Sequence, residues 1–281
     1  MPDSAADGSR ADWACVAAIC LLALLLRFPV ASLPLERDEG EYAYTAQRWM
    51  QGDLPYRDRF DQKPPAIFVA YALIQRVVGV GPAAIHWGAQ LYTLGTLALL
   101  FVLGRQLSSA AAGLAAAAFG AFMTTAPGVW GNAANTELFM LLPLTAAMLA
   151  ACRAVDLESP LWALATGALA AAALLFKQMA ITNLVFYAAF IMWSVRRRAL
   201  AAAMLSLGMV LVLTPVVAYF AAHGALDGAA RAAVAFGDRS ARARSGAGPA
   251  RQPAPARGHR GDAGAPARLP VLDVRRRAAG R

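Results

Sequence analysis

Residues 13–31 read WACVAAICLLALLLRFPVA, an apolar block whose one charge is Arg27. A helix needs about 20 mostly apolar residues to cross a bilayer. Such blocks recur, and 59% of the chain is hydrophobic, above the share typical of soluble domains. The sequence therefore predicts an all-α fold, a polytopic membrane helical bundle, with seven spans near 13–31, 83–103, 109–126, 138–152, 160–176, 179–195 and 199–220.

The segment 66–74 is also apolar, but Gln75 and Arg76 interrupt it. A helix of nine residues rises only about 14 Å, too little to cross a bilayer. We therefore expect an interfacial or re-entrant helix. A second interfacial helix is expected at 41–50, where Tyr42 and Trp49 fall on one face at helical spacing.

The distribution of arginines predicts the orientation. If the N-terminus is inside and 66–74 does not cross, Arg105, Arg153 and residues 196–198 all face the cytoplasm, as the positive-inside rule requires. Residues 32–82 and 127–137 and the turn at Lys177 then lie outside. The predicted organisation is a cytoplasmic N-terminus at 1–12, a transmembrane region at 13–220 with the outer loop 32–82, and an outer segment and tail at 221–281. A cleaved signal peptide is the competing interpretation of the first block, but its leader lacks a basic region.

The tail differs in composition from the rest of the chain. Residues 241–281 contain ten Arg and two Asp, so they carry +8 of the net charge of +9, and a basic nucleic-acid-binding domain is a poor interpretation. Ala, Gly, Pro and Arg make up 32 of these 41 residues, without hydrophobic periodicity. Two interpretations remain: a disordered basic tail, or a frameshifted translation of GC-rich DNA, since all four residues have GC-rich codons. We favour the frameshift.

The outer loop holds three carboxylates within four residues, Asp38, Glu39 and Glu41. Clustered like charges raise one another's pKa or attract a cation. The cluster therefore suits a group that accepts a proton from a hydroxyl, and it leaves open a divalent cation held by Asp38 and Glu41. The alternative is a solvated helix N-terminus, which favours acids.

Lys63 precedes Pro64 and Pro65, and proline restricts the backbone of the residue before it. A cation fixed at headgroup level suits a lipid phosphate; the alternative is snorkelling to ordinary headgroups. Glu137 lies at the mouth of the fourth span, where a carboxylate is costly unless paired or functional. Lys177 lies at the predicted outer turn, against the charge trend, and His86 either faces the site or is packed in the core.

Several motifs resemble the bacterial C-type glycosyltransferases similar to dolichyl-phosphate-mannose–protein mannosyltransferases and the lipid A aminoarabinose transferase. The resemblance covers residues 13–220 and is specific because the motifs occur together in order. They are DEGEYAY at 38–44, GDLPYRD at 52–58, DQKPP at 61–65, NTELFML at 135–141 and FKQ at 176–178.

This resemblance implies a bacterial inner-membrane enzyme that transfers sugar from a polyprenyl-phosphate carrier to a cell-envelope acceptor (glycan, lipid or protein), with its site on the periplasmic face. It implies Asp38 at the catalytic centre with Glu39 adjacent. Lys63 faces the carrier phosphate, and Asp61, Glu137 and Lys177 complete the predicted substrate-binding set.

Family members continue through further spans and carry a distal arginine, so we expect this chain to be truncated or frameshifted. Two other functions stay open: a non-catalytic remnant that binds the lipid carrier, and a transporter or flippase for a lipid-linked sugar. A transporter needs polar groups at mid-membrane, whereas the charges here lie at the ends of the spans.

Overall fold

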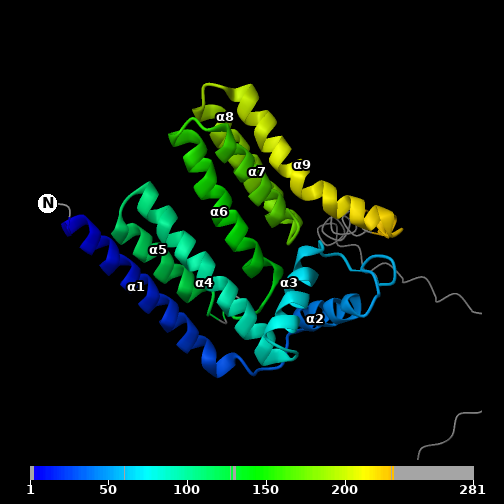
Figure 1. Ribbon diagram of the computed structural model, residues 1–281. Coiled ribbons are helices and arrows are strands. Elements are labelled where there is room, and N and C mark those ends of the chain that lie inside the picture. The colour runs from blue at the N-terminus through cyan, green and yellow to red at the C-terminus, as the bar shows by residue number, and fades with distance from the viewer. Residues whose placement is uncertain (1–2, 60, 127, 129–130, 229, 231–281) are drawn as a thin grey trace, which may run out of the picture. The chain divides into compact units, whose positions relative to one another are not determined.

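A computed structural model describes residues 3–59, 61–126, 128, 131–228 and 230. The chain divides into two units, 1–241 and 242–281. The described part of the first unit is a bundle of helices (Figure 1). The tail from about residue 241 lies outside the described residues, so both interpretations of it stay predictions.

All seven predicted spans coincide with helices, which confirms the helical membrane bundle. The helices are α1 (Asp3–Arg27), α2 (Arg37–Met50), α3 (Ala66–Val77), α4 (Pro82–Leu107), α5 (Ala110–Met123), α6 (Thr136–Asp156), α7 (Pro160–Leu174), α8 (Ile181–Ser194) and α9 (Arg198–Ala222). Among the described residues, four helical stretches are long and apolar enough to cross a membrane: Ser9–Val30, Pro82–Leu107, Thr136–Asp156 and Arg198–Ala222. Since α5, α7 and α8 are shorter, the number of seven crossings stays a prediction.

The helix starts follow from local chemistry. The Ser109 side chain accepts the N–H of Ala112 and caps α5. Pro82 and Pro160 open α4 and α7, where the missing proline N–H costs no helical hydrogen bond.

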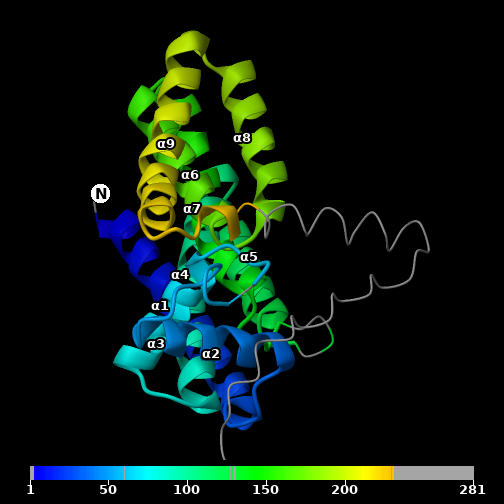
Figure 2. The same cartoon turned by 90° about the vertical axis from the view of Figure 1, so that its right-hand side faces the viewer.

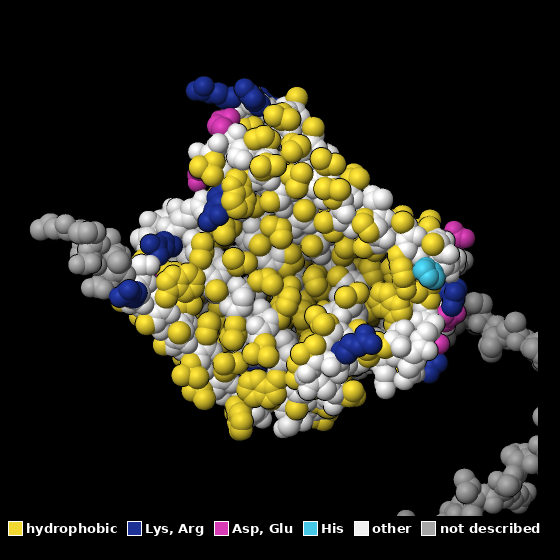
Figure 3. Space-filling view, viewed as in Figure 1, with side chains coloured by type: hydrophobic (Ala, Val, Ile, Leu, Met, Phe, Trp, Pro, Cys, Tyr) yellow, Lys and Arg dark blue, Asp and Glu magenta, His cyan; other side chains and the backbone are white. Residues whose placement is uncertain are grey.

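Small residues bring α7 and α9 into close contact. A Cβ at Gly167 would clash with the Leu205 carbonyl, and one at Gly208 would clash with the Leu164 carbonyl. Small residues allow this approach between helices in a membrane, where apolar side chains gain little by leaving lipid. Hydrophobic side chains predominate on the face in Figure 3, as expected for a surface in contact with lipid.

The bundle has two distinct ends. The helices α2 and α3 lie together at one end in both views (Figures 1 and 2). At the other end Gln106 donates to Asp156 at 3.0 Å, linking α4 to α6, and the Arg153 guanidinium lies over the Trp162 ring. The Arg196 N–H donates to Glu158 there. Arg153 and Arg196 therefore lie at the same end of the bundle, opposite to α2 and α3, and the side of the membrane on which that end lies stays a prediction.

Candidate active site

Lys63 is held in place by contacts on both sides of its backbone. Tyr56, in the left-handed region at φ 70, donates its hydroxyl to the Lys63 carbonyl at 2.6 Å. The Lys63 N–H donates to Asp61 Oδ1 at 2.9 Å. Three residues on, the Ala66 N–H donates to the Leu175 carbonyl. This segment is thus fixed to the end of α7 as well as to its own loop.

Asp38 and Lys63 form an ion pair. The Lys63 Nζ lies 3.4 Å from Asp38 Oδ2, and the exposed fractions of the two side chains are 17% and 38%. The Tyr42 hydroxyl also donates to Oδ2, at 3.3 Å. Burial, together with the Asp38 and Asp61 carboxylates, raises the pKa of Tyr42, so the phenol keeps its proton and donates it. Asp38 is therefore accessible and close to a cation.

Asp61 lies behind this pair and is only 4% exposed. Burial raises its pKa to about 6, although the N–H of Lys63 and the charge of Lys63 oppose the shift. Its second oxygen, Oδ2, has no hydrogen-bond partner among the described residues. A buried acceptor without a partner costs free energy, which favours the protonated form of this carboxyl, in line with its raised pKa.

A second ion pair joins Lys177 to Glu137. The residue next to Lys177, Gln178, donates its side-chain amide to the Gln62 carbonyl at 3.1 Å. Gln62 precedes Lys63, so the two lysines lie on adjoining segments. The structure thus brings Asp38, Lys63 and Asp61 together and sets the Glu137–Lys177 pair on the neighbouring segment.

Glu39 has a different environment from Asp38, although the two are adjacent in sequence. It is 2% exposed. Its Oε1 accepts the Ala134 N–H at 2.5 Å, its Oε2 accepts the Glu36 N–H at 2.8 Å, and the His86 Nε2 lies 3.2 Å from Oε1. Burial raises the pKa of Glu39, but the hydrogen bonds from His86, Ala134 and Glu36 outweigh it and lower the pKa.

His86 completes this buried cluster. Its Nδ1 lies 2.8 Å from the Ala31 carbonyl. A carbonyl and a carboxylate both accept, so a doubly protonated ring satisfies both neighbours. His86 therefore links α4 to α2 and to the end of the first span, and it is packed in the core.

Arg27 was not predicted as part of this region. Its side chain is fully buried, and its Nη1 donates to the carbonyls of Thr124 and Gly131 at 3.3 and 3.4 Å. These contacts hold the loop that also supplies Ala134 to Glu39. The available signal was the single charge in an otherwise apolar span, which is costly unless it is paired.

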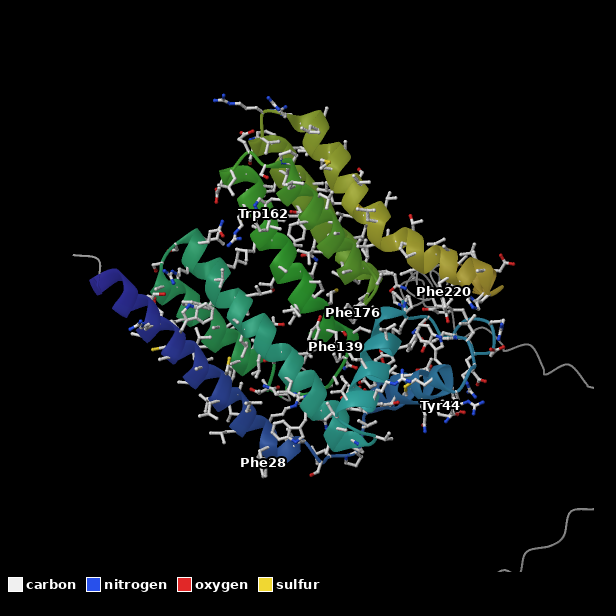
Figure 4. All side chains as sticks on the ribbon, in the orientation of Figure 1. Phe28, Tyr44, Phe139, Trp162, Phe176 and Phe220 are labelled. Atoms are coloured by element: carbon white, nitrogen blue, oxygen red, sulfur yellow. The ribbon has the colours of Figure 1, made fainter. Side chains whose placement is uncertain are left out.

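A large apolar cavity of about 860 Å³ opens beside the two ion pairs. Figure 4 shows Phe139 and Phe176 close together between α6 and the end of α7, where their rings stack at 5.9 Å. Phe139, Phe176 and Phe220 all line the cavity. A smaller cavity of about 260 Å³ is lined by Lys63 and Gln178 and shares Phe220 with the larger one. The apolar space therefore leads to Lys63.

The proposed divalent cation has two candidate ligands, Asp38 and the exposed Glu41. In the described part of the chain, His, Cys, Asp and Glu do not gather in any group of three or more that could hold a metal ion. Two carboxylates are few for a cation site built by the protein alone, although Mg²⁺ often keeps waters or substrate phosphates as its other ligands.

The fold and these contacts define an integral membrane protein with a polar cluster at the end of an apolar cavity. The sequence model of the dolichyl-phosphate-mannose-protein mannosyltransferase family matches residues 62–220, more than half of the chain. The chain belongs to this family and is a membrane glycosyltransferase by class. The match begins at Gln62, so it includes Lys63 but not Asp38. Searches of curated proteins and of solved structures gave no significant match.

Proposed function

We propose that the chain transfers a sugar from a polyprenyl-phosphate carrier to a hydroxyl of a cell-envelope acceptor. The observation that carries the proposal is the Asp38–Lys63 pair beside a cavity that leads from Lys63 into apolar surroundings. A ligand with an anionic head and an isoprenoid tail complements both parts. Residues 32–82 then face the periplasm.

The two lysines bind the donor phosphate in this proposal. Lys63 lines the smaller cavity directly, and Lys177 lies on the segment bonded to it through Gln178. Each lysine is neutralised by a carboxylate, Asp38 or Glu137. A phosphate that enters between them exchanges these partners, and the isoprenoid units nearest to it fill the larger cavity.

The reaction is a direct displacement at the anomeric carbon. Asp38 accepts the proton of the acceptor hydroxyl, and the bond from the anomeric carbon to the carrier phosphate breaks. The leaving phosphate is already anionic, so it needs charge stabilisation by Lys63 rather than a proton. Asp38 is better suited to the proton transfer than Glu39, whose two oxygens are already occupied.

The remaining predicted residues hold the catalytic residues and the lysines in position. Glu39 holds α2 against Ala134 and His86 and so sets the direction of the neighbouring Asp38. Asp61 positions Lys63 by accepting its backbone N–H at 2.9 Å. Glu137 keeps Lys177 at the mouth of the site until the phosphate arrives.

The test is transfer from a radiolabelled polyprenyl-phosphate sugar in proteoliposomes, beside the same sugar phosphate without the isoprenoid chain. We expect transfer from the lipid-linked donor and little from the short one. Lys63→Ala should weaken donor binding and slow the step, and Lys63→Arg should recover part of the loss. The matched control is Arg76→Ala, which removes a cation from the end of α3 and should leave transfer unchanged.

Three results would reject this function. Equal use of both donors would show that the apolar cavity does not bind the isoprenoid chain. Saturable donor binding without transfer, in the presence of a mixed acceptor pool from the envelope, would favour the non-catalytic remnant. Movement of the intact donor across the bilayer would favour a transporter.

A further inference from the structure

A third cavity, of about 420 Å³, lies at the end of the bundle opposite to α2 and α3. It is formed by the turn between α6 and α7 and the turn between α8 and α9. Its polar lining includes Glu158, Ser159, Arg196 and Arg197, and the rest is mostly aliphatic. Cavities of this size hold small ligands. Figure 3 shows basic and acidic side chains gathered at this tip, at the top of the view.

The charges of this cavity are not neutralised by one another. No ion pair within the described residues involves Arg196 or Arg197, and both side chains are exposed. The Glu158 carboxylate accepts the backbone N–H of Arg196 at 3.2 Å rather than a guanidinium. The cavity therefore offers two free cations and one carboxylate at separate positions of its wall.

The backbone at Glu158 supports a role for its side chain. The turn after α6 has the hydrogen bonds of a Schellman motif: Ser159 N–H to Ala154 at 3.1 Å and Glu158 N–H to Val155 at 3.3 Å. The residue in the left-handed conformation of this motif is usually glycine, but here it is Glu158 at φ 49. A glutamate in this strained position places its carboxylate on the cavity wall.

The cavity lies at the level of the lipid headgroups. The span α9 begins at Arg198, directly after the two arginines, so the mouth of the cavity is at one end of a span. Trp193, at the end of α8, is 88% exposed, and tryptophan favours the membrane–water interface. Leu200, in the first turn of α9, lines the cavity and is 42% exposed.

We propose that this cavity binds the phosphoethanolamine headgroup of a membrane phospholipid, with the phosphate on Arg196 and Arg197 and the ammonium on Glu158. A phosphate alone would satisfy the arginines but would be repelled by the carboxylate. A headgroup with both charges complements all three side chains. The site is separate from the sugar-transfer site and does not depend on the function proposed for that site.

Native mass spectrometry of the purified protein tests the assignment, by titration with phosphatidylethanolamine and with phosphatidylglycerol. Wild-type protein should bind the ethanolamine lipid at least about threefold more tightly. The double variant Arg196→Gln/Arg197→Gln should lose about tenfold or more in affinity for both lipids. Glu158→Gln keeps the acceptor for the Arg196 N–H, so it should remain folded and lose only the preference between lipids. Arg198→Gln, outside the cavity lining, is the matched control and should bind as wild type does.

Several outcomes would overturn the assignment. Equal binding by wild type and the double variant would show that Arg196 and Arg197 do not bind the lipid. An equal loss of affinity in Arg198→Gln would show only a general effect of charge. If Glu158→Gln still preferred phosphatidylethanolamine to phosphatidylglycerol, Glu158 would not bind the ammonium. Free phosphoethanolamine that displaces the lipid at equal concentration would identify a soluble ligand instead of a membrane lipid.

Discussion

The polar groups around α2 form two regions with opposite properties. In one, Asp38 is partly exposed and shares Oδ2 with Lys63 and Tyr42 at 3.3 to 3.4 Å. In the other, Glu39 is buried and has contacts to Ala134, Glu36 and His86. The two acids are adjacent in the chain, yet the helix directs one toward Lys63 and the other into the core.

The difference assigns a catalytic role to Asp38 and a structural role to Glu39. A base must reach its substrate and be able to exchange its partners, and Asp38 meets both conditions. A buried carboxylate with partners on both oxygens is a structural link, because a lost partner leaves a buried charge unpaired. The comparison therefore predicts that Asp38 variants lose activity and keep their stability, and that Glu39 variants lose stability.

The largest expected effect is that of Asp38→Asn on turnover. Asparagine keeps the shape of the side chain but cannot accept the proton, so transfer should fall by about a hundred- to ten-thousandfold. The measurement is the rate of transfer from a labelled polyprenyl-phosphate sugar at matched protein amounts. The melting temperature should stay near the wild-type value. Turnover close to wild type would favour the alternative interpretation, in which the acidic cluster is only a solvated helix N-terminus.

Glu39→Ala tests the other side of the comparison. It leaves His86 without its counter-ion and the N–H groups of Ala134 and Glu36 without acceptors, so we expect a loss of about 3–5 kcal/mol in the free energy of unfolding. Denaturant titration of the protein in detergent measures it. The matched control is Glu41→Ala on the same helix, which is exposed and should change stability by no more than about 0.5 kcal/mol. Equal stability of the two variants would contradict the assignment.

Asp61 makes the free energy of unfolding depend on pH. Its pKa is raised from 3.8 to about 6 by burial, so the folded state binds a proton more tightly than the unfolded chain. The stability contributed by this proton is present below pH 4 and is lost as the pH rises through 6, by about 3 kcal/mol in all. Asp61→Asn should remove this slope. Unfolding of both proteins from pH 4 to 8 gives the difference, and a constant difference would reject the raised pKa.

The spans and much of the site were predictable from the sequence. Apolar blocks of about 20 residues report lipid exposure directly, and α1, α4, α6 and α9 occur where such blocks were expected. Lys63 was singled out because two prolines restrict its backbone, and the acids of the first loop because clustered carboxylates shift one another's pKa or attract a cation. The structure joins Lys63 to Asp38, and Lys177 to Glu137.

The contacts between distant segments were not predictable, because spacing along the chain does not report them. The Glu39–His86 pair joins residues of two helices, and only the folded bundle brings them together. The left-handed backbone of Tyr56 also could not be predicted from the sequence, because a bulky residue is unfavourable in that conformation and no local pattern indicates it. Such strain persists only where surrounding contacts maintain it.

Tyr56→Phe has the smallest expected effect and sharpens the comparison within the catalytic region. The change keeps the buried ring and removes the hydroxyl that donates to the Lys63 carbonyl at 2.6 Å. One lost hydrogen bond should lower stability by about 1 kcal/mol. Because the lysine is then less firmly held, the KM for the donor should rise a few-fold while kcat changes little. The control is Tyr44→Phe, whose ring is exposed in the same loop. A fall in kcat with an unchanged KM would show that Tyr56 acts on the chemical step and not on the position of Lys63.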